Sequence, residues 1–212
     1  MAENQSPEAV TAPQRRSVTP RHAASLLVLR PGGREPDVLM GLRGAKHRFM
    51  PNRLVFPGGA VDRADYRARI ASPLPPETLR RLERAAKPSL ARALGVAAAR
   101  ELHEETGLSL GHPPHLDGLH YLCRAVTPPR LPIRFNARFF IVSAERVSGE
   151  LAGSGELEQL RFFTLTEALA LDLSLATRFV LDRLVEWLAM SEAERRARTH
   201  TALLRNFLPR QE

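Results

Sequence analysis

This chain of 212 residues has few of the features that mark secreted or membrane proteins. Its one cysteine, Cys123, excludes a disulfide within the chain and is expected to be a small buried residue on a strand. No apolar run is long enough to cross a membrane, and the first residues lack the basic and apolar regions of a secretory signal. We therefore expect a cytoplasmic protein with no membrane segment.

Lysine is also scarce. Only Lys46 and Lys87 occur, so the formal net charge of +8 comes almost entirely from arginine. Arginine suits two-point contacts with phosphate groups, although coding preference could produce the same bias. Aromatic residues make up 6% of the chain, and the arginines are scattered rather than gathered in a stripe. Nucleic-acid binding is therefore not expected.

Hydrophobic periodicity predicts one globular domain over residues 21–212, after a polar, disordered tail at 1–20. Strands are expected at 22–30 and 37–43, which form a hairpin, and at 54–56, 118–126, 133–143 and 160–163. Short and long amphipathic helices are expected at 166–171 and 174–190, followed by a surface helix at 191–204. Residues 174–204 would then be a region of C-terminal helices.

The segment Arg100–Leu108 carries three glutamates within five residues, Glu101, Glu104 and Glu105. At about 100° per residue, a helix would project all three from one face. Like charges at this spacing destabilise a helix, so a cation held against them is the better explanation than a solvated acidic face. Closely spaced carboxylate oxygens suit Mg²⁺ or Mn²⁺.

Upstream, the short apolar run 54–56 leads into the adjacent glycines Gly58 and Gly59. Such a pair lets the backbone approach a ligand closely, so that its carbonyls could reach a metal held by the helix. Gly59 followed by the sequence RELHEETGL at 100–108 resembles the Nudix box, G-x5-E-x7-R-E-U-x-E-E-x-G-U, in which U is apolar. The resemblance implies the Nudix fold, an α/β/α sandwich with a mixed β-sheet.

The first half of the box departs from the family pattern because an insertion, assigned to residues 66–92, separates Gly59 from Arg100. A helix is expected within this insertion at 77–86, starting near Pro76 and ended by Pro88, with Ser89 capping the next helix. The isolated glutamate of the box has no certain counterpart. Asp65 stands at the nominal offset, and Asp62 is the alternative.

The resemblance also implies roles for single residues. Glu101, Glu104 and Glu105 would be catalytic metal ligands, together with a carbonyl near Gly58 or Gly59. Arg100 would brace Glu104 and the glycine loop. Nudix enzymes commonly add an acid from a loop before the last strand, for which Glu156 is preferred over Glu158. Arg43, Arg48 and Gly58 are candidates for contact with the substrate.

A narrower resemblance, carried by segments 48–65 and 127–140, points to the coenzyme A diphosphatase branch of the family. It implies hydrolysis of coenzyme A or acyl-CoA to 3′,5′-ADP and 4′-phosphopantetheine or its acyl ester. The alternatives are the same chemistry on ADP-ribose, NADH or a dinucleotide polyphosphate, and a nucleotide-binding module without turnover. A homodimer remains open, as does whether the insertion caps the pocket or forms a dimer contact.

Overall fold

The strands of this protein form one mixed sheet. The computed structural model describes residues 18–44, 53–129, 131–153 and 155–212. In this part of the chain the sheet order is β3-β2-β1-β6-β5-β8-β9, with β4 beside β1 and β7 beside β2. Strands β1 and β6 are parallel, as are β5 and β8, and the remaining pairs are antiparallel. The strand bounds are β1 Arg21–Arg30, β2 Asp37–Arg43, β3 Leu54–Val55, β4 Gly58–Ala60, β5 His120–Val126, β6 Phe135–Ser143, β7 Leu157–Thr164, β8 Ala202–Arg205 and β9 Leu208–Gln211.

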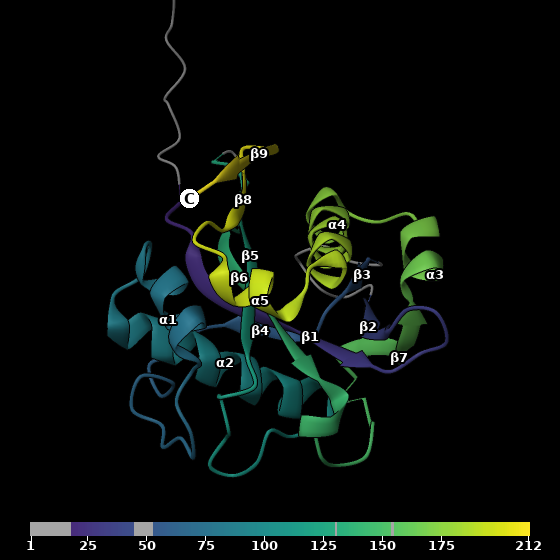
Figure 1. Cartoon of the computed structure of the whole chain (residues 1–212), viewed down its shortest axis with the longest axis horizontal. Coiled ribbons are helices and arrows are strands. Elements are labelled where there is room, and N and C mark those ends of the chain that lie inside the picture. Colours follow the sequence, from purple (N-terminus) through teal and green to yellow (C-terminus); the bar gives the residue numbers. More distant parts are fainter. Residues whose placement is uncertain (1–17, 45–52, 130, 154) are drawn as a thin grey trace, which may run out of the picture.

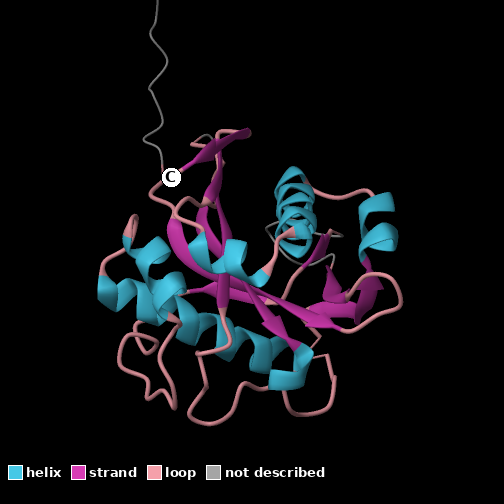
Figure 2. Cartoon of the chain, in the orientation of Figure 1, coloured by secondary structure: helices cyan, strands magenta, loops and turns pink. Residues whose placement is uncertain are grey.

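Helices cover both faces of this sheet (Figure 1; Figure 2). Helices α1 (Pro76–Glu83) and α2 (Pro88–Thr106) lie on one face, and α3 (Leu165–Ala170) and α4 (Leu175–Ala189) lie on the other. A short 3-10 helix, η1 (Ala144–Arg146), follows β6, and α5 (Glu192–Ala197) follows α4. The expected α/β/α sandwich with a mixed sheet is therefore confirmed.

Strand β1 shows why the core has two halves. Side chains alternate along a strand, so Leu26 and Val28 pack toward α2 whereas Leu27 and Leu29 pack toward α4. A strand buried on both faces reads as a continuous apolar run, as 22–30 does. Both apolar faces of β1 are thus covered. The expected hairpin of β1 and β2 is also confirmed.

The predicted insertion is helical only in its second half. Helix α1 starts at Pro76 and ends at Glu83, three residues before the expected end. Thr78 anchors it, since its hydroxyl donates to the Leu119 carbonyl at 2.8 Å and accepts the Tyr121 N–H at 3.1 Å. Residues 88–92 already belong to α2. The predicted cap at Ser89 is wrong, because Pro88 takes the first helical position and Lys87 precedes it without a side-chain cap.

The C-terminal helical region is shorter than predicted. Helix α4 is confirmed, with Ser174 as its N-cap. The expected helix at 191–204 is wrong in its second half, because α5 ends at Ala197 and residues 202–205 form β8. A short apolar pair such as Leu203–Leu204 fits either period, and parallel pairing with β5 decides for a strand. Among the described residues, no helix has the length and apolar character needed to cross a membrane. Residues 1–17 of the predicted tail lie outside the described part of the chain.

Candidate active site

Helix α2 carries the three glutamates, and residues at its two ends determine where it starts and stops. It starts with Pro88 at its first position and ends at Gly107, whose φ of 73° is the left-handed conformation that favours glycine. Alanines line the buried face of the helix, so it packs closely over β1. The three glutamates differ in burial. Glu105 is 2% exposed and Glu101 is partly buried, whereas the Glu104 side chain is 54% exposed.

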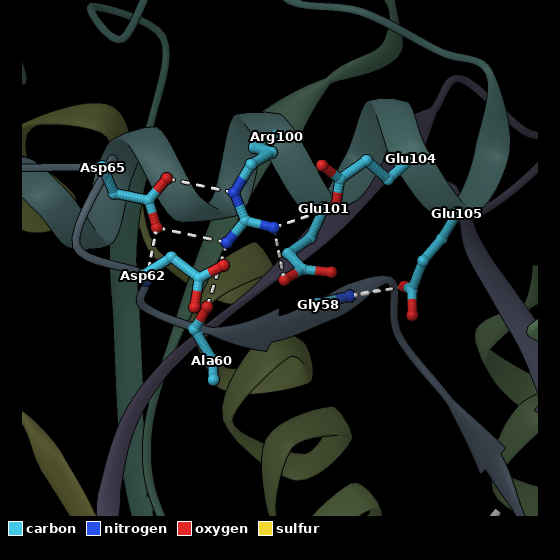
Figure 3. Close-up of polar contacts among 8 residues, drawn as sticks. All are labelled: Gly58, Ala60, Asp62, Asp65, Arg100, Glu101, Glu104 and Glu105. Carbon is cyan, nitrogen blue, oxygen red and sulfur yellow. Dashed lines mark hydrogen bonds and ion pairs between the residues drawn. The ribbon is translucent and has the colours of Figure 1, made fainter. Parts of the chain in front are cut away.

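The glycine pair lies in β4, which is antiparallel to β1 and faces the acidic end of α2 (Figure 3). A Cβ atom at Gly59 would lie 2.2 Å from the Glu101 Oε1. At Gly58 it would lie 2.4 Å from the Ala24 carbonyl oxygen. Glycine at position 58 therefore lets β4 approach the backbone of β1, and a side chain at position 59 would displace the Glu101 carboxylate.

Arg100 joins these two elements (Figure 3). Its guanidinium donates to the Ala60 carbonyl at 3.0 Å and to both carboxylate oxygens of Asp65, at 3.0 and 3.1 Å. Its remaining nitrogen donates to Glu101 and to Glu104, each at 2.8 Å. These are the contacts expected of a brace between the helix and the glycine loop.

Asp65, at the nominal offset of the isolated glutamate of the box, forms an ion pair with Arg100. Asp65 is 1% exposed and accepts the Asp62 N–H at 2.7 Å in addition to its ion pair with Arg100. Asp62 contributes its backbone rather than its carboxylate to this contact. Of the two, Asp65 is the one whose carboxylate contacts Arg100.

Glu105 is the most deeply buried acid of the group. Its Oε2 accepts the Gly58 N–H at 2.8 Å. Burial raises the pKa of Glu105 to about 8; the Gly58 N–H opposes this shift, and the charges of Glu101 and Glu156 add to it. Burial likewise raises the pKa of Glu101, against the effect of Arg100. Both carboxyls therefore lie where a positive charge would be strongly favoured.

A cavity of about 490 Å³ brings the predicted residues together. Glu101, Glu105, Gly58 and Gly59 line it, and so do Arg43 and Glu156. Arg43 and Glu156 lie close together because β2 pairs with β7. This pairing places Arg43 opposite Leu157, and the Gly44 N–H donates to the Glu156 carbonyl at 3.4 Å. Glu156 thus reaches the cavity, whereas Glu158 is exposed on β7 and does not line it.

Some predicted residues stand apart from this cavity. Glu104 does not line it and turns toward Arg100. Arg48 lies outside the described residues. No residue of the insertion at 66–92, all of which is described, lines the cavity, so the insertion does not cap it in this structure. It packs against α2 instead, with Leu74 approaching Gly95 and Leu82 buried in the same core half.

Other cavity residues were not predicted from the sequence. Ser25 lines the cavity from β1, and its position as a polar residue within an apolar strand is the signal that could have marked it. The apolar lining of the cavity gives no such signal because its residues resemble ordinary core. These wall residues are Phe56, Ala125, Val126, Pro128, Leu131, Phe135, Ala137, Phe139, Leu175, Ala176, Leu204 and Phe207.

The acids have the donor chemistry for a divalent cation. Carboxylate oxygens are the preferred ligands of Mg²⁺ and Mn²⁺, and two buried carboxyls with raised pKa values need a compensating positive charge. As the side chains lie, no group of three or more His, Cys, Asp or Glu within the described residues is gathered closely enough to hold a metal. Arg100 engages Glu101 and Glu104, and Gly58 engages Glu105, which accounts for that spacing.

Comparison with known proteins agrees with this architecture. Residues 91–188 match the family model of the NUDIX domain. No curated protein matches the chain in sequence. A NUDIX hydrolase from Alicyclobacillus acidocaldarius is 26% identical, with a TM-score of 0.62 over 79% of this chain and 92% of the other.

Two further solved structures share the fold. A MutT NUDIX hydrolase from Burkholderia pseudomallei is 24% identical, with a TM-score of 0.52 over 79% of this chain and 99% of the other. A MutT protein from Methanosarcina mazei Go1 is 16% identical, with a TM-score of 0.51 over 82% of this chain and 100% of the other.

The chain therefore has the Nudix fold, and residues 91–188 match the NUDIX domain. The domain match and the Alicyclobacillus structure support a hydrolase that acts on pyrophosphate bonds. Enzymes of this type generally use a divalent metal. The coenzyme A diphosphatase branch is not confirmed by these comparisons.

Proposed function

We propose that the protein hydrolyses the diphosphate bond of a nucleoside diphosphate linked to another moiety, with a divalent cation as cofactor. One observation carries the proposal. The cavity joins Glu101 and Glu105 of α2 and the glycine bend with Arg43 and Glu156, and Glu156 lies in the loop directly before β7. This combination matches the needs of a diphosphate, which requires positive charge on its oxygens and a proton acceptor for the attacking water.

Glu101, Glu104 and Glu105 would hold the cation, Mg²⁺ or Mn²⁺, together with the backbone carbonyl of Gly59. When bound, such an ion neutralises diphosphate oxygens and lowers the pKa of a coordinated water. Arg100 acts as a positioning residue, because its bonds to Glu101, Glu104 and Ala60 fix the helix relative to the bend. Binding of the ion by Glu104 requires that its carboxylate leave Arg100 and turn toward the cavity.

In the reaction, water adds to one phosphorus, the bond from that phosphorus to the bridging oxygen breaks, and two phosphate monoesters leave. We assign to Glu156 the role of accepting the proton of the attacking water, because it lines the same cavity as Glu101 and Glu105. Arg43 contributes to phosphate binding. Its Nε is buried in the cavity wall and has no hydrogen-bond partner within the described residues.

Coenzyme A or an acyl-CoA is the favoured substrate. Arg21 and Arg43 both line the cavity, which suits a substrate with a phosphate beyond the diphosphate. The apolar wall, which includes Phe135, Leu175 and Phe207, suits an apolar group attached to the same molecule. ADP-ribose, NADH and dinucleotide polyphosphates are the rival substrates, because they carry the same diphosphate without an acyl chain.

The test is a substrate panel with Mn²⁺ or Mg²⁺ containing coenzyme A, an acyl-CoA, ADP-ribose, NADH and diadenosine tetraphosphate. We expect the coenzyme A compounds to be cleaved fastest, with 3′,5′-ADP as a product identified by chromatography. Faster cleavage of ADP-ribose would reject the coenzyme A assignment and leave the chemistry in place. Absence of cleavage across the panel would favour a nucleotide-binding module without turnover.

The role of Glu156 has its own matched pair of variants. Glu156→Gln removes the proposed proton acceptor, and kcat should fall about a hundredfold. Glu158→Gln changes an equally exposed acid two residues along the same strand end and should leave kcat unchanged. Equal rates in the two variants would remove Glu156 from the reaction.

A further inference from the structure

A second cavity lies at the other end of α4. Its volume is about 730 Å³, and it is bounded by the second half of α4, the segment 197–202 and strand β9. None of its lining residues belongs to the cavity with the glutamates. Basic side chains dominate its wall, namely Arg183, Arg198, His200 and Arg210, against the two acids Glu186 and Glu194.

Buried donors without partners concentrate at this second cavity. Six buried side-chain nitrogen or oxygen atoms in the described part of the chain make no hydrogen bond. One of them is the Arg43 Nε in the proposed active site. Three others are the Arg183 Nε, the Arg198 NH1 nitrogen and the Thr201 Oγ1, all from residues that line the second cavity. We call these three residues the arginine pocket.

The last two unpartnered atoms belong to Arg81 of α1, which is close enough to Arg198 for the two charges to interact. Arg81 is 4% exposed, and its guanidinium lies 5.4 Å from the centre of the Tyr121 ring. Arg198 donates to the carbonyl of the next residue, Leu122, at 3.2 Å. Burial and then the charge of Arg198 lower the pKa of Arg81 to about 10. Positive charge is therefore crowded around this part of β5.

Strand pairing places the three pocket residues close together. Thr201 immediately precedes Ala202, which pairs with Cys123 of β5. Arg198 donates to the Leu122 carbonyl, next to Cys123, and Arg183 lines the same cavity from α4. Backbone hydrogen bonds between Thr201 and Glu212, both 3.0 Å, fix Thr201 in place.

The neighbouring acids do not satisfy the free donors. Glu186 pairs with the NH2 nitrogen of Arg183 at 2.6 Å, which leaves its Nε unused. Glu194 is held by the backbone and hydroxyl of Ser191 in a capping box. Arg183 and Arg198 are partly buried, and both line the cavity.

We propose that the arginine pocket binds a phosphate-type oxyanion, either free phosphate or the phosphate group of a small ester. The two guanidinium groups can only donate hydrogen bonds, the Thr201 hydroxyl can donate one, and a tetrahedral oxyanion offers several acceptors to such donors. Leaving such donors buried and unpaired costs stability, and an oxyanion would satisfy them. The same signature, an unpaired buried arginine nitrogen, occurs at Arg43 in the proposed active site.

The test is thermal unfolding and calorimetric titration of the full chain with inorganic phosphate, using chloride at equal ionic strength as the reference. Phosphate should raise the Tm of the wild-type protein in a saturable manner. Arg198→Gln should weaken phosphate binding about tenfold or more, and Thr201→Val, which keeps the side-chain shape, should weaken it too. Arg196→Gln alters an exposed arginine two residues away that pairs with Glu192, and should behave as wild type.

Arg43→Gln separates this proposal from the proposed function. It should retain the phosphate response, because it alters only the first cavity. A response lost in Arg43→Gln and kept in Arg198→Gln and Thr201→Val would place the anion at the first cavity and overturn the proposal. No saturable response in the wild type would mean that water alone fills the arginine pocket, and would also overturn it. AMP in place of phosphate identifies the source: tighter binding of AMP assigns the site to an ester, and equal binding assigns it to the free anion.

Discussion

The two cavities share α4 and β8 but differ in the sign of the charge that is in excess among their lining residues. Leu175 and Leu204 line the first cavity, and Trp187 and Ala202 line the second. In the first, carboxyls crowd together and burial raises their pKa values. Beside the second, arginines crowd together and burial lowers theirs.

Both cavities therefore keep like charges close together at a cost to folding. Buried charges without full compensation destabilise a protein, and they are concentrated where a ligand supplies the missing charge. The difference in sign then indicates the difference in ligand. A cation belongs with the glutamates, and an anion belongs with the arginines.

The largest expected effect is at Glu105. Glu105→Gln removes one carboxylate charge and keeps an oxygen that can accept the Gly58 N–H, so the fold should persist. We expect kcat/KM to fall about a thousandfold with Mn²⁺, measured on the best substrate of the panel. Phosphate binding by the arginine pocket should be unchanged. Glu83→Gln, an exposed acid on α1, is the control. Retention of more than about a tenth of the activity would contradict the assignment.

Gly59 tests the close approach of the bend to α2. In Gly59→Ala the new Cβ would meet the Glu101 carboxylate, which must then move. A displacement of about 1 Å at such a site lowers the rate about a hundredfold. Gly33→Ala is the matched control, because a Cβ there meets nothing within 4 Å. The rates of the two variants, with far-UV circular dichroism as a check on folding, decide the point. Similar activity in both would show that this contact does not position Glu101.

Arg100 is expected to have an intermediate effect. Lysine in Arg100→Lys keeps the charge but cannot contact Asp65, Ala60 and the glutamates at once. We expect kcat/KM to fall about tenfold together with weaker Mn²⁺ affinity, measured by titration of activity against metal concentration. Arg146→Lys, at an exposed ion pair with Asp117, serves as the control. Unchanged metal affinity would argue that Arg100 stabilises the fold alone.

The smallest expected effect is on the pH dependence of folding stability and involves His120. Burial lowers the pKa of His120, and the positive charges of Arg81 and Arg195 add to this shift. Folding therefore favours neutral His120, and its contribution to stability is present above the pKa of about 6.5 of the unfolded chain. That contribution is lost as the pH falls through the lower pKa of the folded state.

The measurement is the free energy of unfolding in denaturant between pH 7.5 and 5. His120→Gln should reduce the loss of stability on acidification, whereas His200→Gln, at an exposed position, should not. Identical slopes for His120→Gln and the wild type would mean that the positive field at this cavity is too weak to act on His120.

Local features of this chain were predicted well because they depend on neighbours in sequence. Helical geometry fixes the spacing of Glu101, Glu104 and Glu105, and a left-handed Gly107 ends the helix as expected. Alternation along 133–143 predicts β6, with Phe139 and Ile141 on the same face of the sheet. The wrong predictions concern segments whose sequence is compatible with two local structures, as at Ser89 and at Leu203–Leu204.

The sequence alone determined the helical acids, the glycine bend and the Nudix resemblance, because each depends on residues a few positions apart. The tertiary structure decided the rest. Only pairing of β2 with β7 brings Arg43 beside Glu156, and only packing turns Glu104 toward Arg100 while burying Glu105. The arginine pocket joins Arg183 of α4 with Arg198 and Thr201, which precede β8, and β8 is held by its pairing with β5. Such long-range contacts follow from closure of the sheet, and no local spacing records them.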